Sequence, residues 1–350
     1  MKRRLVSLGL CAATAASLSM ALGAADPALP SDPNPPTSAA SPPGVPGAPG
    51  APAALPALVG CSLPAMVDTL RGALKDGSPA LQRYMKFLIK EAALAMPPEE
   101  LSALFAGERD PGLVEALGVA LATRASNTRD FSLLDPVIDR ARAEADPKLR
   151  AAALGGMRGI ASVEVLQQKR ISYEDFMRDP SPEVRDAAVE NLLHENSKIY
   201  FGHDRGVSEA AVKAASACSD PKTAAKLLSG TSMEQVGPDA VQTLVKELRS
   251  EHAEVRAAAA KALGGVPAAS AGTAERALIT HYPGETTTEV RAAMLEGIVH
   301  LRLGGAVPIL ESLRGIDSTL GPDIDAWLKA LSMNLQEWSL VLREKQRIKP

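Results

Sequence analysis

Aromatic residues are scarce in this sequence of 350 residues: two Trp, four Tyr and five Phe amount to 3%, although 46% of the residues are apolar. A core built on large rings is therefore excluded, and Ala, Leu and Val must fill most of it. These small side chains suit helices that pack closely, and Ala and Leu are strong helix formers. The length fits one long repeat array or two ordinary domains.

Residues that perform chemistry are also few, with three Cys and five His. The sequence has no G-x-S-x-G, H-E-x-x-H, C-x-x-C, phosphate-binding glycine loop or EF-hand loop. His194-Glu195 comes nearest, but Lys198 stands where a zinc protease needs its second histidine. We therefore expect no catalytic residue, no metal ligand and no cofactor.

The amino-terminal segment has the pattern of a secretory signal peptide over residues 1–25. Met1–Arg4 is positively charged, Leu5–Leu22 is mostly apolar, and Gly23–Ala25 supplies small residues for cleavage. An uncleaved membrane anchor is the alternative, because about 18 apolar residues nearly span a bilayer. The sequence predicts export to the periplasm or the medium, and membrane attachment only if the leader stays uncleaved.

Positive charge is not in surplus. The formal net charge is -3, and it becomes about -6 without the leader, because 35 basic residues then face 41 acidic ones. Phosphate binding requires a basic face, so nucleic acid is not an expected ligand. Cys61 and Cys218 are the two cysteines outside the leader. An oxidising compartment would allow a disulfide between them, and two free thiols are equally compatible with the sequence.

Residues 26–60 are rich in Pro, Ala and Gly. This composition offers too little apolar bulk to offset the entropy of ordering, so we expect a disordered tether. Residues 61–345 differ, because a short pattern recurs there. Asp146-Pro-Lys-Leu-Arg-Ala-Ala-Ala-Leu-Gly155 returns three times with the Leu or Val, the Arg and the Ala pair preserved, which aligns Arg150, Arg185, Arg256 and Arg291.

Weaker copies of this pattern extend the repeat to eight units. The residue aligned with the proline of the motif marks each unit: Pro79, Pro111, Pro147, Pro182, Pro221, Ala253, Thr288 and Pro322. We expect a helix to begin at every marker, capped in four units by Asp110, Asp146, Ser181 and Asp220. Gly155 and Gly264 are expected to end their helices in a left-handed conformation.

A second apolar helix precedes each marker, for example around residues 135–140, 239–248 and 306–313. Each unit is thus a helical hairpin. A lone hairpin cannot bury its apolar face, so the units must stack on one another. The predicted fold is all-α, a right-handed α-solenoid of about eight hairpins, followed by a short basic tail at 346–350.

The Asp-Pro-x-x-Val-Arg-x-x-Ala-Ala pattern resembles HEAT repeats, particularly the short bacterial kind also found in phycobilin lyases. The resemblance covers most of the chain after the tether and is strongest at 146–158, 181–193 and 252–264. It implies that the repeated Asp and Arg form ladders between units, here Asp146, Arg150, Arg185, Arg256 and Arg291. Ala224 and Asp325 replace the arginine in two weak units, where the ladder should be broken.

The last predicted helix runs from Pro322 to about Glu344 and places Trp327 and Trp338 close to three turns apart on one face. We interpret it as a terminal cap whose rings cover the last hairpin. Asp323 and Asp325 lie at its start, where their negative charges interact favourably with the helix dipole.

One segment, 196–206, departs from the repeat and gathers aromatic and charged side chains. It carries Tyr200, Phe201, His203 and Arg205, and Tyr and Arg are enriched where proteins bind one another. A long connection whose rings plug the core is the alternative interpretation.

The sequence therefore favours a non-catalytic binding or scaffolding protein with protein partners of unknown identity. An enzyme or carrier resembling the bilin lyases and a membrane-anchored periplasmic spacer are the alternative functions.

Overall fold

The computed structural model describes residues 67, 71, 78–198 and 206–348. All of them belong to one compact unit, Leu58–Pro350, and they contain helices and no β-strand. The all-helical expectation is thus confirmed for the described part of the chain. The predicted signal peptide, the tether and the loop at 199–205 lie outside the described residues.

A helix begins at seven of the eight marker positions, and in the last unit it starts one residue early, at Gly321. The predicted helix starts are thus confirmed to within one residue. We call these helices the marker layer: α2 (Pro79–Leu94), α4 (Pro111–Thr128), α6 (Pro147–Gly156), α9 (Pro182–Asn196), α11 (Pro221–Gly230), α13 (Ala253–Gly264), α15 (Thr288–Arg302) and α17 (Gly321–Leu331).

The helices between the markers form a second set, which we call the companion layer. Its members are α3 (Pro98–Gly107), α5 (Asp135–Ala143), α7 (Ser162–Gln168), α8 (Tyr173–Met177), α10 (Val207–Ala217), α12 (Pro238–Glu247), α14 (Ala268–His281) and α16 (Val307–Ile316). Short 3-10 turns lie at η1 (Phe131–Leu134), η3 (Tyr282–Gly284) and η4 (Leu303–Ala306).

Helices pack on their neighbours in chain order, both within the marker layer and between the two layers. Each marker helix packs on the next marker helix, from α2 on α4 through to α15 on α17. From α4 onward, each also packs on the companion helix or helices that precede it in the sequence. The described residues thus form a two-layer stack of hairpins, an arrangement of the α-solenoid type.

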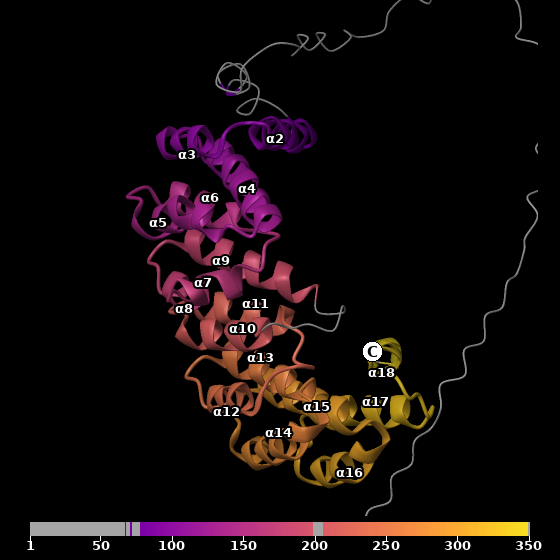
Figure 1. The fold of residues 1–350 in the computed structure, drawn as a ribbon. Coiled ribbons are helices and arrows are strands. Elements are labelled where there is room, and N and C mark those ends of the chain that lie inside the picture. Colours follow the sequence, from indigo (N-terminus) through magenta and orange to yellow (C-terminus); the bar gives the residue numbers. More distant parts are fainter. Residues whose placement is uncertain (1–66, 68–70, 72–77, 199–205, 349–350) are drawn as a thin grey trace, which may run out of the picture. The chain divides into compact units, whose positions relative to one another are not determined.

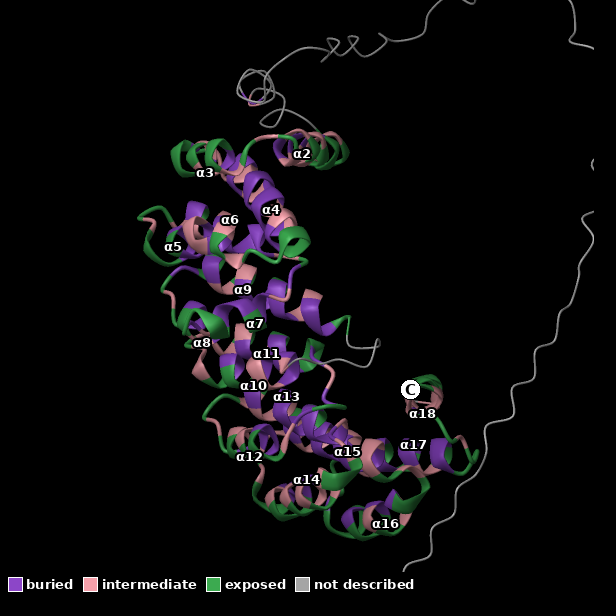
Figure 2. Ribbon diagram, viewed as in Figure 1, coloured by how far each residue is buried: buried purple, intermediate pink, exposed green. Residues whose placement is uncertain are grey.

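The core lies between the two layers, and small and branched apolar side chains fill it. Figure 2 shows buried residues running along the marker helices α4, α6, α9 and α15. Among the fully buried rings are Phe105, Tyr282 and Trp327. The low aromatic content therefore agrees with a core made mostly of Ala, Leu and Val.

Three of the four expected caps form. The side chains of Asp110, Asp146 and Asp220 accept hydrogen bonds from amides in the first turn of α4, α6 and α11, at 3.1, 2.9 and 2.8 Å. Ser181 does not cap α9, because its hydroxyl donates to the Glu183 carboxylate at 2.5 Å.

The prediction that Gly155 and Gly264 end their helices in a left-handed conformation is wrong. Both glycines lie inside their helices, and neither has a positive φ. Glycine is needed near these positions for a different reason. A Cβ atom on Gly264 would lie 2.9 Å from the Cα of Gly297, so α13 and α15 could not approach as closely with a larger residue.

The predicted carboxy-terminal helix is also wrong as a single element. It divides into α17 and α18 (Trp338–Ile348), and Asn334 between them has a φ of 54°. Asn tolerates this left-handed conformation, which a continuous helix cannot contain. Helix α18 continues through Ile348, so the expected tail boundary at residue 346 falls inside it.

One stretch of the described residues, Thr288–Ile316, is long and apolar enough to cross a membrane by length and composition alone. It comprises α15, η4 and α16, and the backbone turns at Leu303, where φ is 45°. Helix α15 packs on α13 and α14, and α16 packs on α17. These contacts are those of core helices in the stack.

Candidate functional site: an arginine ladder and a cavity across three units

Three of the four aligned arginines bind a carboxylate of the following unit. Arg150 donates to both oxygens of Asp179, at 3.1 and 2.9 Å. Arg256 donates to both oxygens of Glu285, at 2.7 and 3.1 Å. Arg291 donates to Asp317 at 2.7 Å. Such charge-assisted and mostly bidentate bonds fix the register between neighbouring hairpins.

The acceptors in this ladder are residues that the sequence analysis did not single out. Asp179 and Glu285 both lie three positions before a marker, and each also accepts the amide hydrogen of the residue two positions later, Ser181 or Thr287. Asp146 was expected among the ladder residues, but its carboxylate accepts the amide hydrogen of Lys148 in its own helix. It caps α6 and binds none of the ladder arginines.

Arg185 makes only the backbone half of this pattern. Its guanidinium donates to the carbonyl oxygens of Asp179 and Pro180, at 2.7 and 3.0 Å, as Arg256 does to Ser250 and Glu251. The residue three positions before the next marker is Cys218, where Asp179 and Glu285 stand in the units that bind Arg150 and Arg256. Burial raises the pKa of the Cys218 thiol, and the nearby Arg185 charge partly opposes that rise.

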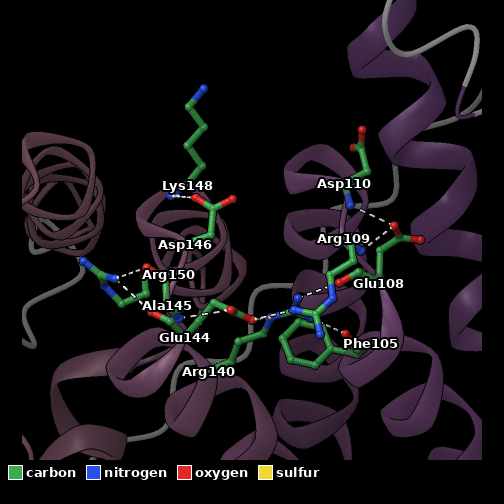
Figure 3. A network of polar contacts seen from close by, with 10 residues as sticks. All are labelled: Phe105, Glu108, Arg109, Asp110, Arg140, Glu144, Ala145, Asp146, Lys148 and Arg150. Atoms are coloured by element: carbon green, nitrogen blue, oxygen red, sulfur yellow. Dashed lines mark hydrogen bonds and ion pairs between the residues drawn. The ribbon is translucent and has the colours of Figure 1, made fainter.

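The first units use an arginine from the companion layer instead (Figure 3). Arg140 is buried and donates to the carbonyl oxygens of Phe105 and Glu108, the latter at 2.5 Å. Its guanidinium lies 5.3 Å from the centre of the Phe105 ring, and Glu144 pairs with it at 3.3 Å. Glu108 accepts the amide hydrogens of Arg109 and Asp110. This network joins α3, α4, α5 and α6.

A second polar cluster is buried between α7, α8 and α9 and contains no cation. The Ser162 hydroxyl bonds to both the Glu195 carboxylate and the Tyr173 hydroxyl. Glu195 also accepts the amide hydrogen of Ser162 at 2.7 Å. Burial raises the pKa of Glu195 above its ordinary value, despite these hydrogen bonds. Ser162 is fully buried, so the cluster serves to cap α7 and offers no open nucleophile.

A cavity of about 410 Å³ crosses three successive marker helices and reaches α18. Ser229, Lys261 and Glu296 line it, and each follows the first residue of α11, α13 or α15 by eight positions. Met233, Gly265 and His300 also line the cavity, and each follows the first residue of the same three helices by twelve positions. The cavity is therefore a product of the repeat, built from equivalent positions in consecutive units.

Stacked rings close one end of this cavity. The Trp338 ring lies 4.2 Å from the His300 ring and 5.8 Å from the Trp327 ring, measured between centroids. Trp327 is fully buried, whereas Trp338 lines the cavity. The ammonium group of Lys345 lies 4.7 Å from the centre of the Trp327 ring and pairs with Asp323 at 2.8 Å.

The charged groups of the cavity are mainly acidic. Glu234 is exposed and forms no ion pair with another described residue, while Glu296 pairs with Lys261 at 3.0 Å. Burial lowers the pKa of His300, and the nearby Glu234 partly opposes this shift. His300 is therefore uncharged at neutral pH, and the cavity carries two carboxylates against one ammonium group.

Other expected site residues fall outside the described part of the chain. Tyr200, Phe201, His203 and Arg205 all lie there, and so does Cys61. Among the residues that the structure describes, no group of three or more His, Cys, Asp or Glu side chains is arranged to hold a metal ion.

The cavity was missed because its lining residues belong to no motif. Their signal was positional: polar residues recur eight places after the markers of three successive units.

Comparison with known proteins identifies no family. No protein-family model matches the chain, and no curated protein matches it. Among solved structures, an engineered protein from the Northeast Structural Genomics Consortium covers 82% of this chain and 79% of its own length, at 20% identity and a TM-score of 0.36. That similarity is too low to carry an argument about function.

Proposed function

We propose that this protein is an exported, non-catalytic binding or scaffolding module. In this proposal the hairpins are HEAT-like, they wind into a right-handed solenoid, and the stack presents an extended surface to a protein partner outside the cytoplasm. The signal-peptide pattern at residues 1–25 supports the compartment. The ladder arginines then serve to hold the units in register.

One observation carries the proposal: the cavity lined by Ser229, Lys261 and Glu296 repeats equivalent positions of three units. A groove that runs from unit to unit matches a ligand that is itself extended and repetitive, such as a polypeptide segment. A compact metabolite would instead need a few polar groups converging on one point.

Site-specific photo-cross-linking tests this function. A benzophenone amino acid replaces Ser229, which is exposed at the cavity, or Ala269, which is exposed on the companion helix α14. The chains are produced with their leader in an exporting bacterium and irradiated in intact cells. We expect protein adducts of defined mass from position 229 and none of the same mass from position 269.

Two results would contradict the proposal. One is the absence of protein adducts at position 229 in every envelope and culture fraction. The other is a pigment or other small molecule that co-purifies with the full chain in native mass spectrometry, which would favour a carrier resembling the bilin lyases.

Export is tested through the amino terminus of the secreted protein. We expect the mature chain to begin near Asp26 after cleavage in the small-residue segment. A membrane-bound chain that retains Met1 would support the anchored spacer instead.

The loop proposal is tested separately. Replacing Tyr200, Phe201 and Arg205 by alanine, with His203 unchanged, should weaken the adduct at position 229 if the loop also contacts the partner.

A further inference from the structure

We propose that the cavity between α11, α13, α15 and α18 binds an extended peptide segment that carries lysine or arginine side chains. This inference rests on the proposed function and names the chemistry of the partner. The charge of the lining, its apolar surface and the spacing of the units support it.

The net negative charge of the cavity lining favours cationic side chains of a partner. Glu296 and Lys261 neutralise each other at 3.0 Å, which leaves Glu234 as the unneutralised group of the lining. Glu337, directly before Trp338 in the sequence, adds a second exposed carboxylate beside α18. A lysine or arginine side chain of a partner would pair with these groups, whereas an acidic segment would be repelled by them.

The lining also provides apolar surface for the rest of such a segment. Leu228, Met233 and Ala262 are buried residues at the floor, and Trp338 forms the end wall. Lysine and arginine carry long apolar stems, and they can lay these on such a floor while the charged end reaches a carboxylate.

The dimensions of the stack set the length of the segment. Packed helices lie about 8–10 Å apart, and an extended chain advances about 3.3 Å per residue, so each unit spans roughly three residues. A segment of about nine residues therefore covers the three units that line the cavity. A peptide with one basic residue in every three places at least one cation near Glu234 in any register.

Both tryptophans of the chain lie at this site, since Trp338 lines the cavity and stacks on Trp327. Tryptophan emission depends on local polarity and on neighbouring charge. Intrinsic fluorescence of the unlabelled full chain therefore reports occupancy of this cavity.

The test compares two nine-residue peptides, three repeats of Lys-Leu-Gly and three repeats of Glu-Leu-Gly, titrated into the full chain at 50 and 200 mM salt. We expect the lysine peptide to shift the tryptophan emission and to bind at least about tenfold more tightly than the glutamate peptide, as complementary charge requires. The preference should shrink at the higher salt concentration.

A pair of charge-reversal variants locates the interaction. Glu234→Lys should weaken binding of the lysine peptide about tenfold, because it reverses the charge at the cavity. Glu254→Lys is the matched control: Glu254 is exposed on α13, seven positions before Lys261, and its replacement changes the net charge equally. We expect less than about a twofold effect from the control. Melting temperatures verify that both variants are folded.

Three results would overturn the inference: equal affinity for the two peptides, equal effects of the two variants, or binding that leaves the tryptophan emission unchanged. Protein adducts at position 229 together with any of these results would leave the binding function intact and refute only the basic partner. Absence of adducts would refute the proposed function itself.

Discussion

Gly156 of α6 lies directly against Gly118 of α4: a Cβ atom added to Gly156 would stand 2.8 Å from the Cα atom of Gly118. The backbones of these two marker helices therefore meet with no side chain between them. Gly264 and Gly297 repeat the arrangement between α13 and α15. Close crossings at two places along the stack set how tightly neighbouring hairpins approach.

Gly156→Ala should destabilise the protein by about 1–3 kcal/mol, because the added methyl group forces α4 and α6 apart. Chemical denaturation followed by circular dichroism measures the change. Gly272→Ala is the control, since Gly272 lies in α14 and has nothing within 4 Å of its Cβ position. This control should stabilise by about 0.5–1 kcal/mol, because alanine is the better helix former. Equal effects of the two changes would refute the role of the crossing.

The Arg256–Glu285 pair should make stability depend on acid. Burial alone would raise the pKa of Glu285, but hydrogen bonds from Arg256 and the Thr287 amide outweigh it and lower the pKa to about 2. A carboxyl group with a lowered folded-state pKa stabilises the protein above its ordinary value of 4.5, and this contribution is lost as the pH falls toward 2.

Arg256→Met should therefore cost about 3 kcal/mol at pH 7, because it leaves Glu285 buried without its cation. The difference from the unmodified protein should shrink as the pH falls from 4.5 toward 2. Urea titrations across this range measure it. A difference that stays constant with pH would mean that the pair contributes through packing alone.

Cys218→Asp should strengthen the weak rung of the ladder. An aspartate there would stand three positions before the marker, as Asp179 does, and within reach of the Arg185 charge. We expect a gain of about 1 kcal/mol at pH 7 under reducing conditions, the net contribution of a typical intramolecular hydrogen bond. Cys218→Asn, which has the same shape without the charge, should show no such gain. The double variant C218D/R185M should lose it.

Glu195→Gln should remove a decline of stability at high pH. Burial raises the pKa of Glu195 in the folded state. The folded protein therefore keeps a proton on this carboxyl group at pH values above 4.5, the ordinary pKa, where the unfolded chain releases it. Stability then falls as the pH rises from 4.5 through the folded-state pKa.

Glutamine keeps an acceptor for the Ser162 amide and cannot ionise. We expect the Glu195→Gln variant to be at least as stable as the unmodified protein at pH 8 and to match it near pH 4, by thermal melts at both values. Glu195→Ala, which removes the acceptor for the buried amides, should lose about 1–3 kcal/mol at either pH. A Gln variant that is weaker at pH 8 would show that the carboxylate is the required form.

Sequence reasoning worked best where local rules act alone. Six of the eight markers are prolines, and a proline near a capping residue before an apolar run favours a helix start whatever the surroundings are. Ala253 and Thr288 were predicted from the recurring Glu-Val-Arg pattern that follows them. It failed at Gly264, because a glycine at a helix end and a glycine at a helix crossing look alike in one sequence. It failed again at Asn334, where one left-handed residue ends α17 and lets α18 turn back onto it.

The candidate site was predicted least well. Lys261 and Glu296 are ordinary surface residues in the sequence, and they become a site only because α13 and α15 pack side by side and align equivalent positions. The ladder acceptors were hidden for the same reason. Asp179 lies 29 residues from Arg150 in the sequence, a distance at which no local rule pairs two charges.

The sequence by itself determined the helical content and the period of the repeat, since caps, prolines and apolar spacing act within a few residues of the backbone. The tertiary structure alone decided which charges pair, which glycines lie at crossings, and where a cavity opens beside Trp338. These features depend on how close two separate helices come, and that distance follows from the packing of all the side chains between them.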